Sequence, residues 1–399
     1  MKNVSAPVAL ACLFAAYATG EPAQAIAEKG IVFLEDGKLP EAELQFARAL
    51  KVNPRLFEVQ NLMGVALDRE GKHKEARGYF TKAIELRKDY APAHANLGLN
   101  AIEAQDYRLA ITEFRRTLAL DPRQPNANAL RYNLALAFYR KGEYALSLRA
   151  LEEVHDPAAR DPGYFALAGS DHRELGNSRE AVESLRKAAD GEPENSHYLY
   201  DLAIGLIQSG AAGEALQRLD AGVRRCPACA DLYAALGVAC YAAGRNEESA
   251  ANYRKAIELD PTAADIRAAL GDLYGAAGAF DKSAIEYETA LRLDPGNVSY
   301  LVKQGRNWIR LQQLAKAETA FRKALAADPR NVDAYFNLGK MAARQGDAQA
   351  AVRRFEKAAE LDPENSAALY QLGLAYRKCG QLQKAALAMN RFRQLNLDQ

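Results

Sequence analysis

The sequence carries almost no excess of charge of either sign. Lysine and arginine together number 52, and aspartate and glutamate together number 51. Nucleic acids and anionic membrane surfaces attract proteins through clustered positive charge, so a nearly neutral chain argues against either of them as the default partner. Apolar residues make up 49% of the chain and charged residues 26%, which is typical of a folded protein and not of a disordered one.

Residues that usually carry catalysis or bind metals are few and scattered. No glycine-rich phosphate loop follows a predicted strand, and the acidic pairs Glu152-Glu153 and Glu247-Glu248 are typical of solvated helix faces. The five histidines lie in separate parts of the chain, with no spacing that would make two of them ligands of one metal: His73, His94, His155, His172 and His197. The sequence therefore predicts no catalytic residues, no metal and no cofactor.

Long hydrophobic runs are also missing, and the longest stands at the N-terminus. It extends from about Ala6 to Ala18, which is short of the roughly 20 residues that span a membrane. One lysine precedes it and small residues follow it, which is the layout of a secretory signal peptide. We predict a signal peptide over residues 1–20, cleaved after Gly20 or, alternatively, after Ala25. The mature protein would be periplasmic or secreted, unless an uncleaved or lipidated N-terminus, for instance at Cys12, tethers it to a membrane.

Cysteine is rare, and two of the five cysteines stand close together. Cys226 and Cys229 form the sequence CPAC just before a predicted helix. One interpretation is a local disulfide that closes a turn in an oxidising compartment, or simply two thiols. The other is a redox-active dithiol, because a helix N-terminus lowers the pKa of a thiol. A thioredoxin-like site needs a strand–turn–helix setting, which is not predicted here.

The sequence contains a repeat with a fixed period. The stretch LDPENSAALYQLGLAY at 361–376 has counterparts 34 residues earlier, ADPRNVDAYFNLGKMA, and 68 residues earlier, LDPGNVSYLVKQGRNW. Each unit has two apolar helical patterns, the first ending at a glycine and the second at a proline, which are residues that end helices. Each unit is therefore a predicted helix–turn–helix that buries its apolar face only by stacking on its neighbours.

This pattern resembles the tetratricopeptide repeat, W-x2-L-G-x2-Y followed by A-x3-F and then P. Within each unit, position 8 is usually glycine, position 20 is alanine or serine, and position 24 is usually aromatic. The predicted units cover residues 23–399 and begin at 23, 57, 91, 128, 162, 196, 230, 264, 298, 332 and 366. The resemblance implies an all-α fold, a right-handed α-solenoid. At 155–163, where a proline comes early, a hinge and ordinary drift of the repeat are both open interpretations.

The resemblance also implies where a ligand binds. In this family the first helix of each unit lines a concave groove that holds extended peptides, and asparagine at position 6 hydrogen-bonds the peptide backbone. Asn96, Asn133 and Asn337 stand at that position. Tyrosines that offer apolar area with a polar tip fall on the same lining: Tyr132, Tyr139, Tyr200, Tyr241 and Tyr370.

Basic residues gather toward the C-terminal end of this lining. Within a unit they recur at intervals of three and four residues, which places them on one helix face: Lys303, Arg306 and Arg310, then Lys340 and Arg344. In the last unit Lys378 continues the series, with Arg377 beside it. We predict that this part of the groove binds an acidic peptide segment or a chain terminus. The alternative is a solvated charged surface, because exposed charges are common and individually contribute little.

The sequence thus predicts a non-catalytic, exported adaptor or scaffold that binds peptide segments of partner proteins. Two alternatives remain: a thiol–disulfide active protein that uses Cys226 and Cys229, and a structural subunit of an envelope or secretion assembly. In the last unit we also predict a surface for self-association, formed by apolar residues among Leu387, Met389, Phe392 and Leu395.

Overall fold

The computed structural model describes residues 22–156, 158 and 160–397. Among these residues every regular element is a helix, and no strand is present. The predicted all-α class is therefore confirmed. The predicted signal peptide lies outside the described residues.

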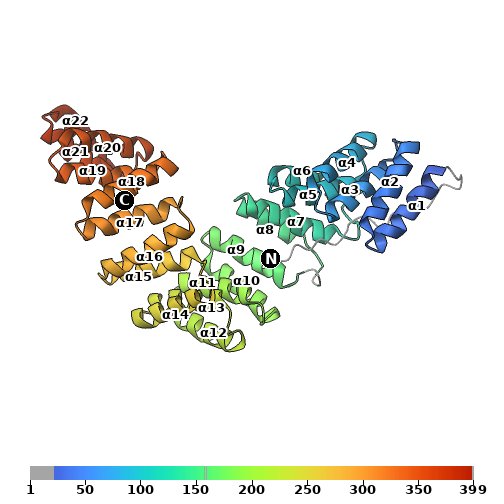
Figure 1. Ribbon diagram of the computed structural model, residues 1–399, viewed down its shortest axis with the longest axis horizontal. Coiled ribbons are helices and arrows are strands. Elements are labelled where there is room, and N and C mark those ends of the chain that lie inside the picture. The colour runs from blue at the N-terminus through green and yellow to red at the C-terminus, as the bar shows by residue number, and fades with distance from the viewer. Residues whose placement is uncertain (1–21, 157, 159, 398–399) are drawn as a thin grey trace. The chain divides into compact units, whose positions relative to one another are not determined.

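The chain divides into two compact units, and the first of them ends at Gly210. Its helices pair in chain order, each pair forming one repeat with a tight turn between the two helices (Figure 1). They are α1 (Pro22–Glu35), α2 (Leu39–Val52), α3 (Phe57–Arg69), α4 (His73–Leu86), α5 (Ala91–Glu103), α6 (Tyr107–Leu120), α7 (Ala127–Arg140), α8 (Tyr144–Glu152), α9 (Pro162–Glu174), α10 (Ser178–Gly191) and α11 (Ser196–Gln208).

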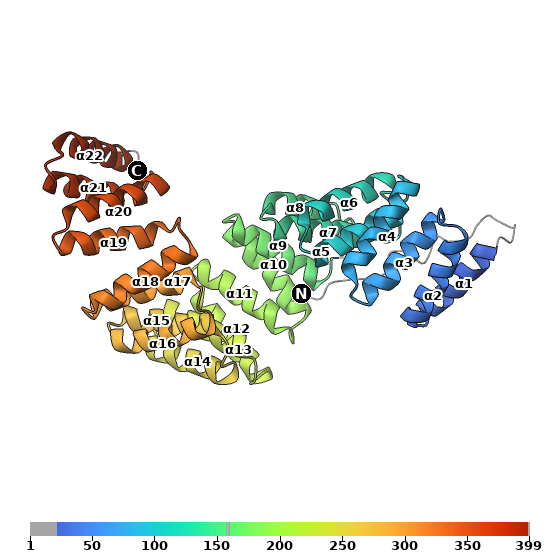
Figure 2. The same cartoon turned by 45° about the horizontal axis from the view of Figure 1, so that its top comes forward.

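The second unit begins at Ala211, so the division separates the two helices of the sixth repeat. The interpretation of 155–163 as a hinge stays a prediction. Within this unit each repeat stacks on the next, as the turned view also shows (Figure 2). The helices are α12 (Ala212–Arg225), α13 (Ala230–Ala242), α14 (Asn246–Leu259), α15 (Ala264–Ala276), α16 (Phe280–Leu293), α17 (Val298–Arg310), α18 (Leu314–Ala327), α19 (Val332–Arg344), α20 (Ala348–Leu361), α21 (Ser366–Lys378) and α22 (Leu382–Leu397).

Inside most of the repeats, an aromatic ring lies directly on a glycine of the facing helix. A Cβ added to Gly339 would lie only 2.6 Å from Cε1 of Phe355, and one added to Gly64 would lie 2.5 Å from Cε1 of Phe80. Both rings are fully buried. A larger residue at these glycines would force the two helices apart, because close-packed interiors do not absorb an extra methyl group without strain.

Neighbouring repeats are joined by a recurrent polar contact at position 10 of the unit. Asn100 Nδ2 donates to the backbone oxygen of His73 (2.9 Å), at the start of the preceding second helix. In the ninth repeat, Asn307 Nδ2 donates in the same way to the backbone oxygen of Phe280 (2.8 Å). These bonds satisfy buried amides and fix how one repeat lies against the next.

The fifth repeat has an aspartate at this position. Asp171 is fully buried, and neither of its carboxylate oxygens has a hydrogen-bond partner among the described residues. Burial raises its pKa to about 7, and the neighbouring Ser147 hydroxyl offsets only part of that effect. A charged carboxylate is costly in such a site, so the folded protein favours the protonated form.

We predict that Asp171→Asn stabilises the protein in a pH-dependent way. Because the pKa of an unfolded aspartate is about 4, the folded carboxyl binds a proton between pH 4 and 7 that the unfolded one releases. The stability of the wild type should therefore fall as the pH rises through this range and remain low above pH 7. Asparagine does not ionise and can donate as Asn100 and Asn307 do. Urea denaturation should show a gain on the order of 2 kcal/mol at pH 8 that shrinks near pH 5. An equal effect of the substitution at both pH values would contradict this account.

Candidate peptide-binding groove

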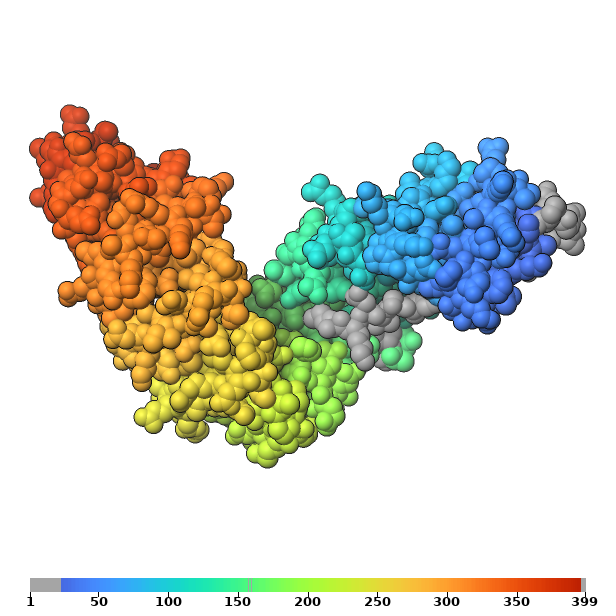
Figure 3. Space-filling view, in the orientation of Figure 1, coloured from blue at the N-terminus to red at the C-terminus, as the bar shows by residue number. Residues whose placement is uncertain are grey.

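A groove opens along the first helices of the eighth, ninth and tenth repeats, entirely within the second unit. Its volume is about 670 Å³, and its walls come mainly from α15, α17 and α19. Phe280, Ser283 and Tyr287 of α16 also line it, as do Asn365, which precedes α21, and Ala367 at the start of α21. Figure 3 shows the repeats of this unit, from yellow to red, as one continuous stack.

Five basic side chains line this groove. Lys303, Arg306 and Arg310 come from α17, and Lys340 and Arg344 come from α19. The intervals of three and four residues place the members of each set on one face of their helix. These five side chains thus line one surface, and a role of this surface in peptide binding stays a prediction.

Two of the five cations are neutralised by aspartates of neighbouring repeats. Lys303 Nζ lies 2.7 Å from Asp272 Oδ2, and Arg306 Nη2 lies 2.6 Å from Asp333 Oδ1. The Tyr287 hydroxyl also donates to Asp272, at 2.5 Å. Burial, followed by this hydrogen bond, raises the pKa of Tyr287 far above its ordinary value, so the hydroxyl keeps its proton. Both ion pairs are largely exposed, and each therefore adds little to stability.

The other three cations have no carboxylate partner among the described residues. The Arg310 guanidinium lies 5.3 Å from the ring centroid of Phe280, and the Lys340 ammonium lies 5.5 Å from that of Phe336. Arg344 is exposed and makes no ion pair within the described chain. The aromatic rings orient two of these cations without cancelling their charge. The groove therefore keeps a local surplus of positive charge although the whole chain is close to neutral.

Other predicted groove residues of the second unit lie elsewhere or are already engaged. Asn337 is buried at the groove floor and donates from Nδ2 to the backbone oxygen of Asp333 (2.8 Å). Arg377 and Lys378 line a separate hollow of about 470 Å³ at the last repeats. Tyr370 is 41% exposed, and its ring packs 5.3 Å from that of Phe392. Tyr241 is 49% exposed on α13.

In the first unit, the predicted residues are mostly buried in the fold. Asn96 is buried, and its Nδ2 donates to Asn61 Oδ1 at 3.0 Å, so this amide serves contact between repeats. Asn133 is likewise buried. Tyr132 is half-buried, and burial together with the Asp161 charge raises its pKa to about 12.

Tyr139 packs against the ring of Tyr144, with 5.6 Å between centroids. Burial raises its pKa, and the nearby positive charge of Arg173 offsets part of that effect. Tyr200 is half-buried and has contacts of its own. These tyrosines therefore do not form a continuous exposed lining in the first unit.

Sequence reasoning missed the acidic and aromatic partners of the cations. Asp272 lies 31 residues before Lys303, and Asp333 lies 27 residues after Arg306. Both separations are close to one repeat length. The charge sign at positions one repeat away was the available signal for these pairs. Phe336 falls on the predicted lining by its repeat position, but Phe280 carried no comparable signal, because aromatic residues in a repeat are usually interpreted as core.

The cysteine pair is joined in the structure. Cys226 and Cys229 form a disulfide with their Cα atoms 5.5 Å apart. The bond closes the turn between α12 and α13, so its setting is helix–turn–helix, without the strand expected at a thioredoxin-like site.

In the described part of the chain, no group of three or more His, Cys, Asp and Glu side chains is arranged to hold a metal ion. The same residues include no helix that is both long enough and apolar enough to cross a membrane.

Comparison with known families agrees with the repeat geometry. A tetratricopeptide repeat model matches residues 27–91, 96–164, 167–228 and 302–352, which together are more than half of the chain. Two further tetratricopeptide repeat models match 264–297 and 355–386, and a TPR repeat model matches 239–278. The chain belongs to the tetratricopeptide repeat family.

Individual relatives are distant and only partly covered. A TPR repeat-containing protein from Bacillus subtilis, YpiA, is 24% identical over 193 residues, which span 48% of this chain and 44% of that protein. The human protein O-mannosyl-transferase TMTC3 is 25% identical over 205 residues, which are 49% of this chain and 22% of that protein. The chain thus spans less than half the length of these relatives.

Among solved structures, yeast Tom70 is similar in fold. It superposes with a TM-score of 0.53 at 16% identity and covers 91% of this chain and 96% of its own. At this identity the likeness shows the fold alone. The tetratricopeptide repeat fold is typical of protein-interaction scaffolds, and proteins of the family bind peptides or other proteins.

Proposed function

We propose that this tetratricopeptide repeat protein is a non-catalytic adaptor that binds an acidic peptide segment, or an acidic chain terminus, of a partner protein in the groove of the eighth to tenth repeats. The observation that supports this most strongly is the set of three cations, Arg310, Lys340 and Arg344, which line the groove without a carboxylate partner among the described residues.

The side chains of the groove are suited to an acidic peptide. In the same groove, Lys303 and Arg306 already bind the carboxylates of Asp272 and Asp333. An arginine guanidinium binds a carboxylate through two parallel hydrogen bonds, which orients the ligand as well as attracting it. The rings of Phe280 and Phe336 offer apolar surface beside the charges. Because each exposed ion pair contributes at most about 1 kcal/mol, a ligand needs several acidic residues in a row.

We predict that Arg310→Glu, Lys340→Glu and Arg344→Glu together weaken binding of a labelled hexaglutamate peptide by at least tenfold. The change removes the attraction and introduces repulsion at three contacts. Fluorescence anisotropy measures the affinity, and for the wild type it should fall as salt rises, since screening shortens the reach of surface charges. Hexaglutamine should bind neither protein measurably, because it lacks the carboxylates.

A matched control variant carries the same change in net charge outside the groove, at Lys323, Arg330 and Arg353. These three side chains are exposed and do not line the groove. This control should bind hexaglutamate nearly as well as the wild type. Equal losses in the two triple variants would show attraction by overall charge, and unchanged binding by the groove variant would remove this groove as the site.

We further propose that the protein is exported, either to the periplasm or to the outside, with membrane tethering as the alternative. A disulfide such as Cys226–Cys229 persists mainly in oxidising compartments, which supports this location. We predict that the mature chain begins at Glu21, as measured by N-terminal sequencing of protein recovered from its native cells. A chain that still begins at Met1 would contradict cleavage, and one that begins at Ile26 would move the cleavage site.

Finally, we propose that the last repeat mediates self-association, through a narrower surface than the sequence indicated. Phe392 packs on Tyr370, and Met389 lies against Gly373, so both serve their own repeat. Leu387 is 70% exposed beside a shallow groove of about 470 Å³ that includes Leu369 and Tyr376. An exposed leucine at a hollow lined in part by apolar side chains offers a contact for a second copy.

We predict that Leu387→Glu lowers the mass measured by sedimentation at high protein concentration to that of the monomer. Ile285→Glu is the matched control, because Ile285 is also well exposed, at 61%, but lies on α16. It should leave the association unchanged. A wild-type protein that stays monomeric across the whole concentration range would rule out this surface.

A further inference from the structure

Several turns between consecutive repeats have a side-chain bridge from their first residue to their fourth. In the turn before α17, Asn297 Nδ2 donates to Asp294 Oδ2 at 2.9 Å. In the turn before α21, Asn365 Nδ2 donates to Asp362 Oδ2 at 3.2 Å. Each bridge joins the end of one repeat to the beginning of the next.

The same asparagines also cap the helix that follows. Asn297 Oδ1 accepts from the backbone N–H of Tyr300 (3.2 Å), and Asn365 Oδ1 accepts from that of Ala368 (3.0 Å). A side-chain cap of this kind satisfies one of the free N–H groups in the first helical turn. One residue thus performs two tasks, a link across the turn and a helix cap.

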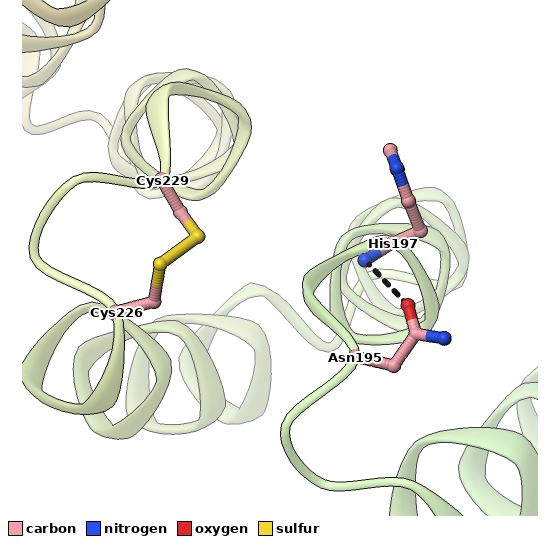
Figure 4. Close-up of a disulfide and its surroundings, with 4 residues drawn as sticks. All are labelled: Asn195, His197, Cys226 and Cys229. Atoms are coloured by element: carbon pink, nitrogen blue, oxygen red, sulfur yellow. Dashed lines mark hydrogen bonds between the residues drawn. A yellow bond between two sulfur atoms is a disulfide. The ribbon is translucent and has the colours of Figure 1, made fainter.

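The first unit contains a third turn of this type. Asn195 Nδ2 donates to Glu192 Oε2 at 3.0 Å, and Asn195 Oδ1 accepts from the backbone N–H of His197 at 3.2 Å. Figure 4 shows this cap together with the disulfide of the next turn between repeats. The two turns have the same length and the same proline at their second position.

In that next turn, cysteines occupy the first and the fourth positions. Cys226 follows the last residue of α12, and Cys229 is the residue that precedes α13. The disulfide joins them where the other turns place an amide and a carboxylate (Figure 4). Cys229 makes no side-chain hydrogen bond to the helix that it precedes. Here the covalent bond therefore stands in for the polar bridge, and the cap is absent.

We propose that the Cys226–Cys229 pair is a redox modification site that sets the stability of the junction between α12 and α13. Reduction by a dithiol breaks the sulfur–sulfur bond. The two electrons and two protons come from the dithiol, which closes to its own disulfide, and Cys226 and Cys229 become thiols. Both cysteines are half-buried and the Pro227-Ala228 segment between them is exposed, so a small dithiol can reach the bond.

Reduction leaves this turn with weaker links than its counterparts. A thiol is a poor hydrogen-bond donor and acceptor, so two thiols do not restore the bridge that Asp294 and Asn297 make. The N-terminus of α13 stays without the side-chain cap that Asn297 and Asn365 give to their helices. The unfolded form of the junction also regains the chain entropy that the closed loop had removed.

Hydrogen exchange of the full-length protein tests this directly, with and without dithiothreitol. In the wild type, reduction should speed exchange at the end of α12 and the start of α13 on the order of tenfold, because local opening becomes easier. Peptides that cover the Asp362–Asn365 turn should not respond to the reductant. Intact-mass spectrometry must show that the protein gains two hydrogen atoms when the disulfide is reduced to two thiols.

Two double variants separate the bridge from the disulfide as such. Cys226→Asp with Cys229→Asn copies the turn at 362–365 and should exchange as slowly as the oxidised wild type, whether or not reductant is present. Cys226→Ser with Cys229→Ser should exchange quickly in both conditions. A reduced wild type that exchanges no faster than the oxidised form would overturn the proposal. The proposal would also be overturned if the variant with Cys226→Asp and Cys229→Asn exchanged as fast as the serine variant. Because the readout is exchange at α12 and α13, the result does not depend on whether the groove binds acidic peptides.

Discussion

The contact between a glycine at position 8 and an aromatic ring at position 24 determines which residues of this protein face the groove. In the ninth repeat a Cβ on Gly305 would lie 2.6 Å from Phe321, so α17 can approach its partner helix only with that glycine turned inward. Arg306 and Arg310 lie about 100° and 140° further round the helix. They are therefore held away from the core. The tenth repeat copies this arrangement, with Gly339 on Phe355 and with Lys340 and Arg344 at the same offsets. Two tightly packed repeats thus present these four cations to one groove, where Asp333, Phe280 and Phe336 contact three of them.

Charge is distributed unevenly along a chain that is nearly neutral in total. Asp272 and Asp333 reach the groove from the repeats on either side of α17 and neutralise Lys303 and Arg306. This arrangement limits repulsion among five cations in a small volume, while three of them remain available to a ligand. The same groove therefore has an ordered, neutralised part next to a part with surplus positive charge. We infer that the neutralised part holds the part with surplus charge in place. The affinity for an acidic ligand, and the dependence of that affinity on salt, then come from the surplus charge.

Periodicity predicted the fold and much of the groove, but it did not predict the partners of individual side chains. The 34-residue spacing placed Lys303, Arg306 and Arg310 on one helix face, and the structure brings them together with Lys340 and Arg344. The same spacing gave Asn96 a role in peptide binding, whereas its amide donates to Asn61 in the neighbouring repeat. Repeat position alone cannot show this, because the outcome depends on which residue stands opposite. Repeat position also grouped Arg377 and Lys378 with the basic residues of the ninth and tenth repeats, although these two line a different hollow. The proposed role of Cys226 and Cys229 rests on the likeness of their turn to the turns at 294–297 and 362–365, which repeat spacing does not show.

The central claim is that the charge of the groove, and not merely its shape, selects the ligand. A reciprocal binding measurement tests this most directly, with hexalysine offered to the variant in which Arg310, Lys340 and Arg344 are all glutamate. The account predicts that this variant binds hexalysine while the wild type does not, and that the same three substitutions placed at Lys323, Arg330 and Arg353 confer no such binding. If the groove variant fails to bind hexalysine while its circular dichroism shows an intact helical fold, or if the surface variant binds it equally well, the groove is not the charge-selective site of this protein.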